Sequence, residues 1–213
     1  MSQDPAPSAT VRDDLLAAAL ALIVEHGDLA FSLRQLAEAA DTSTMSIYTQ
    51  FGNREGLYRA LAGEAFELFA AGLAEVDVAD NTDAPSALRA MAAAYRRFAT
   101  EYPSAFDLIF GGVVSFDAVE PLVDEFEGRP APSATGYEVY GMFASVFSNG
   151  VTAGSIRSDV PLRLVMDSYW AQMHGLVALE RLGYVRSAAD AGERFAFGID
   201  TIIAGLAPPG PHS

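Results

Sequence analysis

Side chains with hydroxyl groups dominate a short stretch around residue 45, and they carry the most specific chemistry in this chain. The stretch also holds one thioether and one phenol, and its candidate functional residues are Thr42, Thr44, Met45, Ser46 and Tyr48. Such groups are suited to contact base edges and phosphates in the major groove of DNA. Arg34 and Arg54 flank the stretch at expected helix N-termini, where backbone N–H groups also favour phosphate. The alternative for both arginines is a solvated helix end.

Capping signals predict the helices that position these side chains. Ser32 and Gln35 form a capping box, and Ser43 and Asn53 are typical N-cap residues. The helices are expected at residues 33–40, 44–50 and 54–76, behind a first helix at residues 10–27 that begins with Thr10 and Asp13 and ends at Gly27. Two short helices joined by a three-residue turn and packed behind a longer helix have the layout of a helix-turn-helix. An ordinary helical hairpin is the alternative.

Composition excludes several classes of site. The chain has 213 residues, of which 51% are hydrophobic, and it has no cysteine, so disulfides and thiolate metal sites are excluded. Its three histidines are isolated in sequence, and neither a catalytic motif nor a metal or cofactor site is recognisable. No apolar run is long enough for a membrane span. We expect a non-enzymatic protein in the cytoplasm, without contact with a membrane.

The charge balance limits how this chain could bind DNA. The net charge is −15, and all thirteen basic residues are arginine. Such a charge argues against non-specific coating of nucleic acid, which depends mainly on neutralising phosphates. Between residues 31 and 60, however, the charges balance, because this segment contains three arginines and three acidic residues. DNA binding must therefore depend on the geometry of a small local surface.

The remaining chain is expected to form an all-helical domain rich in aromatic side chains. Helices are expected at residues 86–102, 104–110, 137–153, 162–183 and 188–206, and strand signals are absent. Aromatic and sulfur side chains at helical spacing could form a core or line an apolar cavity; the candidates for a ligand pocket are Tyr95, Phe98, Phe110, Met142, Phe143, Phe147, Trp170, Met173 and His174. Trp170 and His174 lie one turn apart, so shared packing is the default and ligand contact the alternative.

The stretch from Phe31 to Ala62 (FSLRQLAEAADTSTMSIYTQFGNREGLYRALA) resembles the DNA-binding domain of TetR-family transcriptional regulators. The similarity includes the spacing of Ile47, Tyr48 and Phe51. In the C-terminal part, Trp170-Ala-Gln-Met-His174-Gly175 is similar to a motif of one group of TetR C-terminal domains, and residues 95–111 fit the same group. Two features differ from the usual pattern: Asp41 and Thr42 stand where glycine and an apolar residue are usual, and residues 44–50 lack a lysine or arginine.

The resemblance implies an all-α homodimer with a helix-turn-helix domain at residues 1–56 and an effector-binding and dimerisation domain at residues 57–213. It implies a repressor that binds a palindromic operator and is released by a small apolar or aromatic effector. Tyr48 and Arg54 would contact phosphates, and Thr44, Met45 and Ser46 would approach bases. Residues 162–183 and 188–206 would pair with their copies into a four-helix bundle. The alternative is a helical ligand-binding or interaction protein that keeps this fold without DNA recognition.

Overall fold

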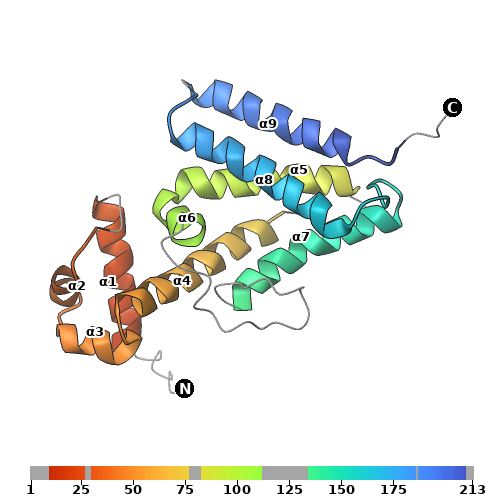
Figure 1. Ribbon diagram of the computed structural model, residues 1–213. Coiled ribbons are helices and arrows are strands. Elements are labelled where there is room, and N and C mark those ends of the chain that lie inside the picture. The colour runs from red at the N-terminus through yellow and green to blue at the C-terminus, as the bar shows by residue number, and fades with distance from the viewer. Residues whose placement is uncertain (1–9, 27–29, 77–82, 112–133, 186, 210–213) are drawn as a thin grey trace, which may run out of the picture. The chain divides into compact units, whose positions relative to one another are not determined.

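The computed structural model describes residues 10–26, 30–76, 83–111, 134–185 and 187–209. The described residues form only α-helices and no strand, which confirms the predicted all-α class (Figure 1). The helices are α1 (Val11–His26), α2 (Leu33–Ala39), α3 (Thr44–Phe51), α4 (Arg54–Ala74), α5 (Ala84–Glu101), α6 (Pro103–Phe110), α7 (Ala134–Thr152), α8 (Leu162–Arg181) and α9 (Ala188–Gly205). No helix in this part of the chain is both long and apolar enough to span a bilayer.

Helices α2, α3 and α4 begin at the positions that the capping residues predict. The Ser32 hydroxyl accepts from the backbone N–H of Gln35, whose side-chain oxygen accepts from the backbone N–H of Ser32 at 2.8 Å. Asn53 Oδ1 likewise accepts from the backbone N–H of Gly56 at 2.8 Å at the start of α4. These bonds satisfy N–H groups that the first helical turn leaves without partners. Gly27, the expected end of the first helix, lies outside the described residues.

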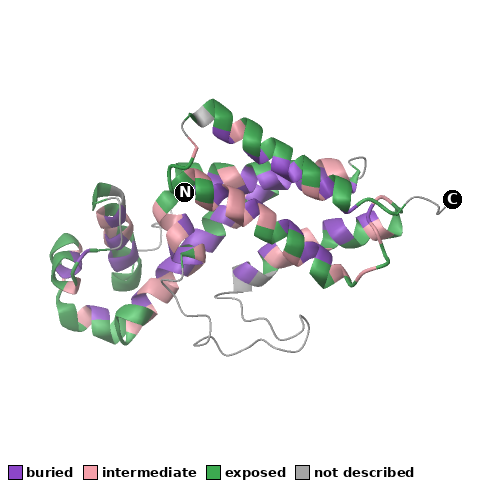
Figure 2. Ribbon diagram, turned by 45° about the horizontal axis from the view of Figure 1, so that its top comes forward, coloured by how far each residue is buried: buried purple, intermediate pink, exposed green. Residues whose placement is uncertain are grey.

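One compact unit contains α1, α2, α3, the first part of α4 and α6. Its core is built from apolar side chains that are almost completely buried, among them Leu15, Phe31, Leu36, Ile47 and Leu57 (Figure 2). Each of α1, α2 and α3 contributes to this core, so the three helices hold one another in place. This packing sets which face of α3 is turned to solvent.

The second unit contains the rest of α4 together with α5, α7, α8 and α9. Its largest buried side chains include Tyr95, Tyr169 and Phe147. Helices α8 and α9 lie along each other (Figure 1). A Cβ atom at position 198 would lie 2.5 Å from Leu176 Cδ1, so a larger residue there would require the Leu176 side chain to move. The division between the units falls inside α4, after Glu67, so the expected domain boundary at residue 56 stays a prediction.

Candidate DNA-binding site

The turn between α2 and α3 is closed by two backbone hydrogen bonds. The N–H of Asp41 donates to the Glu38 carbonyl at 3.2 Å, and the N–H of Thr42 donates to the Ala37 carbonyl at 2.8 Å. This pair of bonds is the Schellman motif that ends many helices, and it requires a left-handed residue. Asp41 is that residue, with a φ of 47°. Aspartate therefore adopts the conformation for which glycine is usual at this position.

Helix α3 is fixed on its inner side by one side chain and presents several others to solvent. Ile47 is completely buried, whereas Met45 is 70% exposed and Tyr48 is 49% exposed. Thr44 is exposed as well. The Ser43 hydroxyl caps the helix by accepting from the Ser46 N–H at 3.2 Å. A recognition helix of a helix-turn-helix lies in the major groove with its outer face against the base edges, and α3 has such a solvent-facing side.

Several hydroxyl groups of this region bond within the protein. Thr42 Oγ1 donates to Ser46 Oγ at 2.9 Å, and Ser43 Oγ lies 3.1 Å from the same atom. Thr42 and Ser46 are tied in this way to the turn and to the first turn of α3. This leaves Thr44, Met45 and Tyr48, all exposed, as the more accessible of the predicted contact residues.

The two predicted phosphate ligands differ in their surroundings. Arg34 is exposed near the start of α2. The Arg54 guanidinium donates from Nη2 to the Phe31 carbonyl and from Nε to the Tyr58 hydroxyl at 3.0 Å, and it lies 5.4 Å from the centre of the Tyr58 ring. Arg54 thus holds the start of α4 against the segment before α2. Two of its five N–H groups are used in these bonds.

Three further residues belong to this surface and were not among the predicted contacts. Thr49 and Gln50 are exposed on α3. Arg12, on α1, places its guanidinium 4.8 Å from the centre of the Phe51 ring, which brings a cation to the C-terminal end of α3. Helical periodicity around buried Ile47 predicts that Thr49 points outward, and the same periodicity could have identified Gln50. Nothing in the sequence signals that Arg12 lies beside α3, because that proximity is a tertiary contact.

In the second unit, three of the predicted pocket residues come together. The Tyr95 hydroxyl lies 2.9 Å from His174 Nδ1, and the rings of Trp170 and His174 are 5.7 Å apart between centroids. Burial raises the pKa of Tyr95 above its usual range, while a hydrogen bond with the Trp170 side chain opposes this shift. Burial also lowers the pKa of His174, because desolvation disfavours the charged imidazolium. The cluster joins α5 to α8, with Tyr95 buried, His174 half-buried and Trp170 45% exposed.

The other predicted pocket residues are spread over several contacts, and Phe98 is linked to Tyr95 because Phe69 packs against both rings. Phe98 packs against Phe69, and Phe143 and Phe147 both pack against Tyr169. Met173 is buried and Met142 is half-buried. Phe110 belongs to the first unit, where it contacts Phe66 and Phe106. Whether the nine residues line one ligand pocket stays a prediction.

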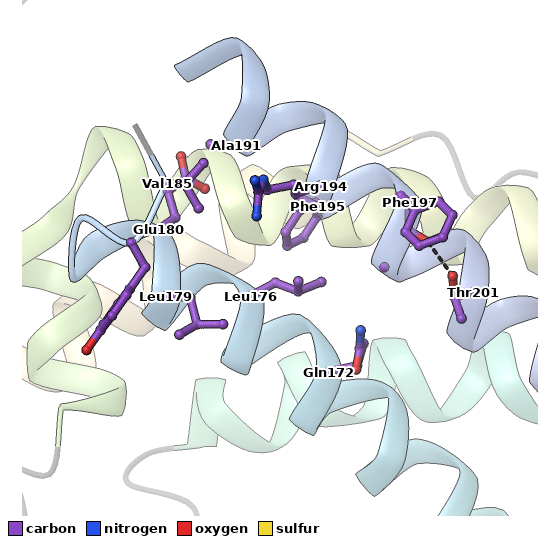
Figure 3. A pocket seen from close by; sticks show the side chains of 12 residues that line it. Gln172, Leu176, Leu179, Glu180, Val185, Ala191, Arg194, Phe195, Phe197 and Thr201 are labelled. Atoms are coloured by element: carbon purple, nitrogen blue, oxygen red, sulfur yellow. Dashed lines mark hydrogen bonds between the residues drawn. The ribbon is translucent and has the colours of Figure 1, made fainter. Parts of the chain in front are cut away.

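A groove that sequence reasoning missed runs along the outer side of α8 and α9. It has a volume of about 340 Å³ and a mainly apolar lining to which Leu176, Leu179, Phe195 and Phe197 contribute (Figure 3). Phe197 is 75% exposed. None of the predicted pocket residues lines this groove. It occupies the two helices that were expected to form the subunit interface.

Comparison with known families identifies both parts of the chain. Residues 15–61 match the family of bacterial regulatory proteins of the tetR type, and residues 88–202, more than half of the chain, match the tetracyclin repressor-like C-terminal domain. The chain belongs to the TetR family. The predicted resemblance is thereby confirmed in both halves, and the fold is that of a TetR-family transcription regulator.

Relatives of this TetR-family chain agree with the assignment. The transcriptional repressor ComR of Escherichia coli K12 is 38% identical over 65 residues, which are 30% of this chain and 31% of ComR. A protein with unknown function from Rhodococcus sp. RHA1 is 25% identical and has a TM-score of 0.73, with 97% of this chain and all of that chain covered.

Two further solved structures share the fold. PfmR from Thermus thermophilus, a TetR-family regulator, is 23% identical with a TM-score of 0.61, covering 90% of this chain and 98% of PfmR. RolR, solved in complex with resorcinol, is 17% identical with a TM-score of 0.61, covering 93% of this chain and 88% of RolR. TetR-family regulators are generally non-enzymatic proteins that bind DNA and small molecules, typically as dimers.

Proposed function

We propose that this TetR-family chain is a transcriptional repressor that binds a palindromic operator as a homodimer and is released by a small effector. The observation that carries the proposal is the geometry of α3. Ile47 is completely buried and fixes the helix, while Met45 and Tyr48 remain exposed. The helix belongs to a domain that matches a family of bacterial regulatory proteins. In a helix-turn-helix the corresponding helix binds in the major groove of DNA, where these exposed side chains would contact the bases and the backbone.

The contacts divide by the chemistry of the side chains. Tyr48 and Arg34 are exposed and suited to phosphates, and Arg54 has N–H groups left over after its two bonds within the protein. Thr44 and Met45, both exposed on α3, would approach base edges. Thr42 and Ser46 take part chiefly by fixing the turn, although their hydroxyl oxygens can still accept a bond.

The face formed by α8 and α9 supports the proposed dimer. Six of the eleven large hydrophobic side chains that are exposed in the described chain lie between residues 164 and 197, on or between these helices. Exposed apolar groups concentrated on one pair of helices are typical of an interaction site, and in the proposed dimer a second copy related by a two-fold axis covers them with the same helices. Such a dimer would place two copies of α3 about 34–36 Å apart, one turn of DNA. Phe197→Asp is expected to yield monomers in sedimentation.

The proposed effector is apolar or aromatic and binds within the second unit. Supporting this, Tyr95, Trp170 and His174 combine aromatic surface with a few hydrogen-bonding groups, a typical composition for a small-molecule site. The related fold of RolR holds resorcinol, a small aromatic diol. Binding need couple to the DNA-binding conformation by only ~1–3 kcal/mol to change operator affinity about 5- to 150-fold.

Selection of bound sequences from random duplex DNA tests the central claim. Enrichment of a palindromic consensus by the wild-type protein, and its loss in Tyr48→Ala, is the expected result. Leu68→Ala is the matched control, because it removes a similarly exposed apolar group from α4 in the second unit. Failure to enrich any sequence would favour a protein that keeps the fold without DNA recognition. The net charge of −15 and the Asp41 carboxylate beside α3 are the observations that favour this alternative.

A further inference from the structure

The outermost line of α3 consists of two side chains, Met45 and Thr49. Ile47 is completely buried and therefore marks the innermost line of the helix. Successive residues of an α-helix are rotated by about 100°, so residues two positions before and after Ile47 lie roughly 160–200° away from it. Met45 is 70% exposed and Thr49 is exposed. A partner that binds the outer face of α3 therefore contacts Met45 and Thr49 first.

The surface that these two residues present has little capacity to donate hydrogen bonds. Thr49 Oγ1 donates to the Met45 carbonyl at 2.9 Å, so its hydrogen is already used within the helix. Methionine has no donor, and its sulfur is a weak acceptor. The neighbouring Ser46 hydroxyl is engaged with Thr42 and Ser43. The outermost surface of α3 therefore consists mainly of methyl and thioether groups.

The composition of α3 also removes the usual means of recognising guanine. The commonest base-specific contact is arginine or lysine bound to the O6 and N7 atoms of guanine. Helix α3 (TMSIYTQF) contains neither residue, and its one amide, Gln50, lies near its C-terminal end. The thymine C5-methyl group is the apolar feature that base pairs present in the major groove. The apolar surface formed by Met45 and Thr49 therefore matches the major-groove edge of A·T pairs better than that of G·C pairs.

We propose that Met45, supported by Thr49, determines operator specificity by packing against thymine methyl groups, so that the base pairs facing the middle of α3 are A·T. The inference rests on the proposed function, because it requires α3 to enter the major groove. It adds the class of base pair that α3 selects and the residue that selects it.

Deoxyuridine tests the inference directly, because it differs from thymidine only in lacking the C5-methyl group. The probe is a fluorescein-labelled duplex of the sequence that selection from random DNA enriches, with each thymine replaced in turn and affinity measured by anisotropy. At one or two positions in each half-site, replacement is expected to weaken binding about 4-fold, the factor that corresponds to ~0.8 kcal/mol for one buried carbon group. Met45→Ala is expected to abolish this difference, and Leu68→Ala to preserve it.

The outcomes separate this inference from the function on which it rests. Enrichment of a palindrome whose thymines can all be replaced without loss overturns the role of Met45 and leaves DNA binding standing. Equal discrimination by wild type and Met45→Ala overturns it as well. Failure to enrich any sequence overturns both the inference and the proposed function. Because Met45 is exposed, its replacement leaves the core of the unit intact, and an unchanged melting temperature confirms that the variant is folded.

Discussion

Replacing Asp41 tests how the turn before α3 is built. Asp41 has a φ of 47°, and the backbone bonds that close the turn depend on that conformation. Residues other than glycine, asparagine and aspartate lose about 1–2 kcal/mol in the left-handed region. Asp41→Ala removes the carboxylate and also introduces a residue that is unfavourable in the left-handed conformation. Asp41→Asn removes the carboxylate alone, so the pair of variants separates backbone strain from charge.

The expected effect on stability follows from the conformation. Asp41→Ala should lower the free energy of unfolding by about 1 kcal/mol, which lowers the melting temperature by roughly 2–4 °C for a chain of this length that unfolds as one cooperative unit. Asp41→Asn should change it little. Asp41→Gly should also change it little, because relief of the left-handed conformation is offset by glycine's greater freedom in the unfolded chain, about 0.5–1 kcal/mol. Urea denaturation followed by circular dichroism measures all three variants.

The expected effect on DNA binding follows from the charge. A carboxylate about 10 Å from a phosphate in water weakens binding by roughly twofold per subunit. Asp41→Asn and Asp41→Gly should therefore both tighten operator binding at low salt, and added salt should reduce the difference. Fluorescence anisotropy at two salt concentrations measures this effect. Asp41→Ala as stable as Asp41→Asn would refute the argument from the left-handed turn, and unchanged affinity in Asp41→Asn would refute the argument from charge.

Three further predictions concern the DNA surface and the cluster in the second unit. Tyr48→Ala should abolish operator binding in gel shifts while the dimer stays intact in sedimentation; normal binding would show that α3 is oriented differently. With two to four phosphate contacts per subunit, the logarithm of operator affinity should fall against the logarithm of salt concentration with a slope of roughly −4 to −7, and a slope of −10 or steeper would contradict this. Burial lowers the pKa of His174 below 6.5, so the folded state resists protonation, and stability present above pH 6.5 should decrease as the pH falls through the folded-state pKa. The melting temperature of His174→Asn should depend less on pH over that range, and an identical dependence would exclude His174 as the cause.

Local signals were enough to predict the helix-turn-helix. The capping box at Ser32 and Gln35 and the cap at Asn53 are formed by residues three apart, so the sequence alone contains both partners of each bond. Apolar periodicity operates over the same short range, and the completely buried Ile47 is the inner residue of α3. Asp41 was noted as a departure from the family pattern, but its left-handed conformation becomes evident only in the closed turn.

Contacts between distant segments were beyond sequence reasoning. Arg54 was expected at phosphates, and the structure shows that part of its guanidinium holds the Phe31 carbonyl, 23 residues away. Residue type and helical spacing indicate which residues could line a pocket, but they do not reveal that Phe110 packs in a different unit from Tyr95. Periodicity shows that a helix has an apolar face and leaves open what that face covers.

The amino-acid sequence by itself determined the all-α class, the positions of the helices and the family, because caps, turns and apolar periodicity operate over three to seven residues. Tertiary structure alone decided which hydroxyls of α3 are already bonded, that Tyr95 meets His174 across two helices, and that an apolar groove opens along α8 and α9. These features depend on side chains that the chain brings together from far apart. Their positions are set by the packing of whole helices, which short-range patterns do not encode.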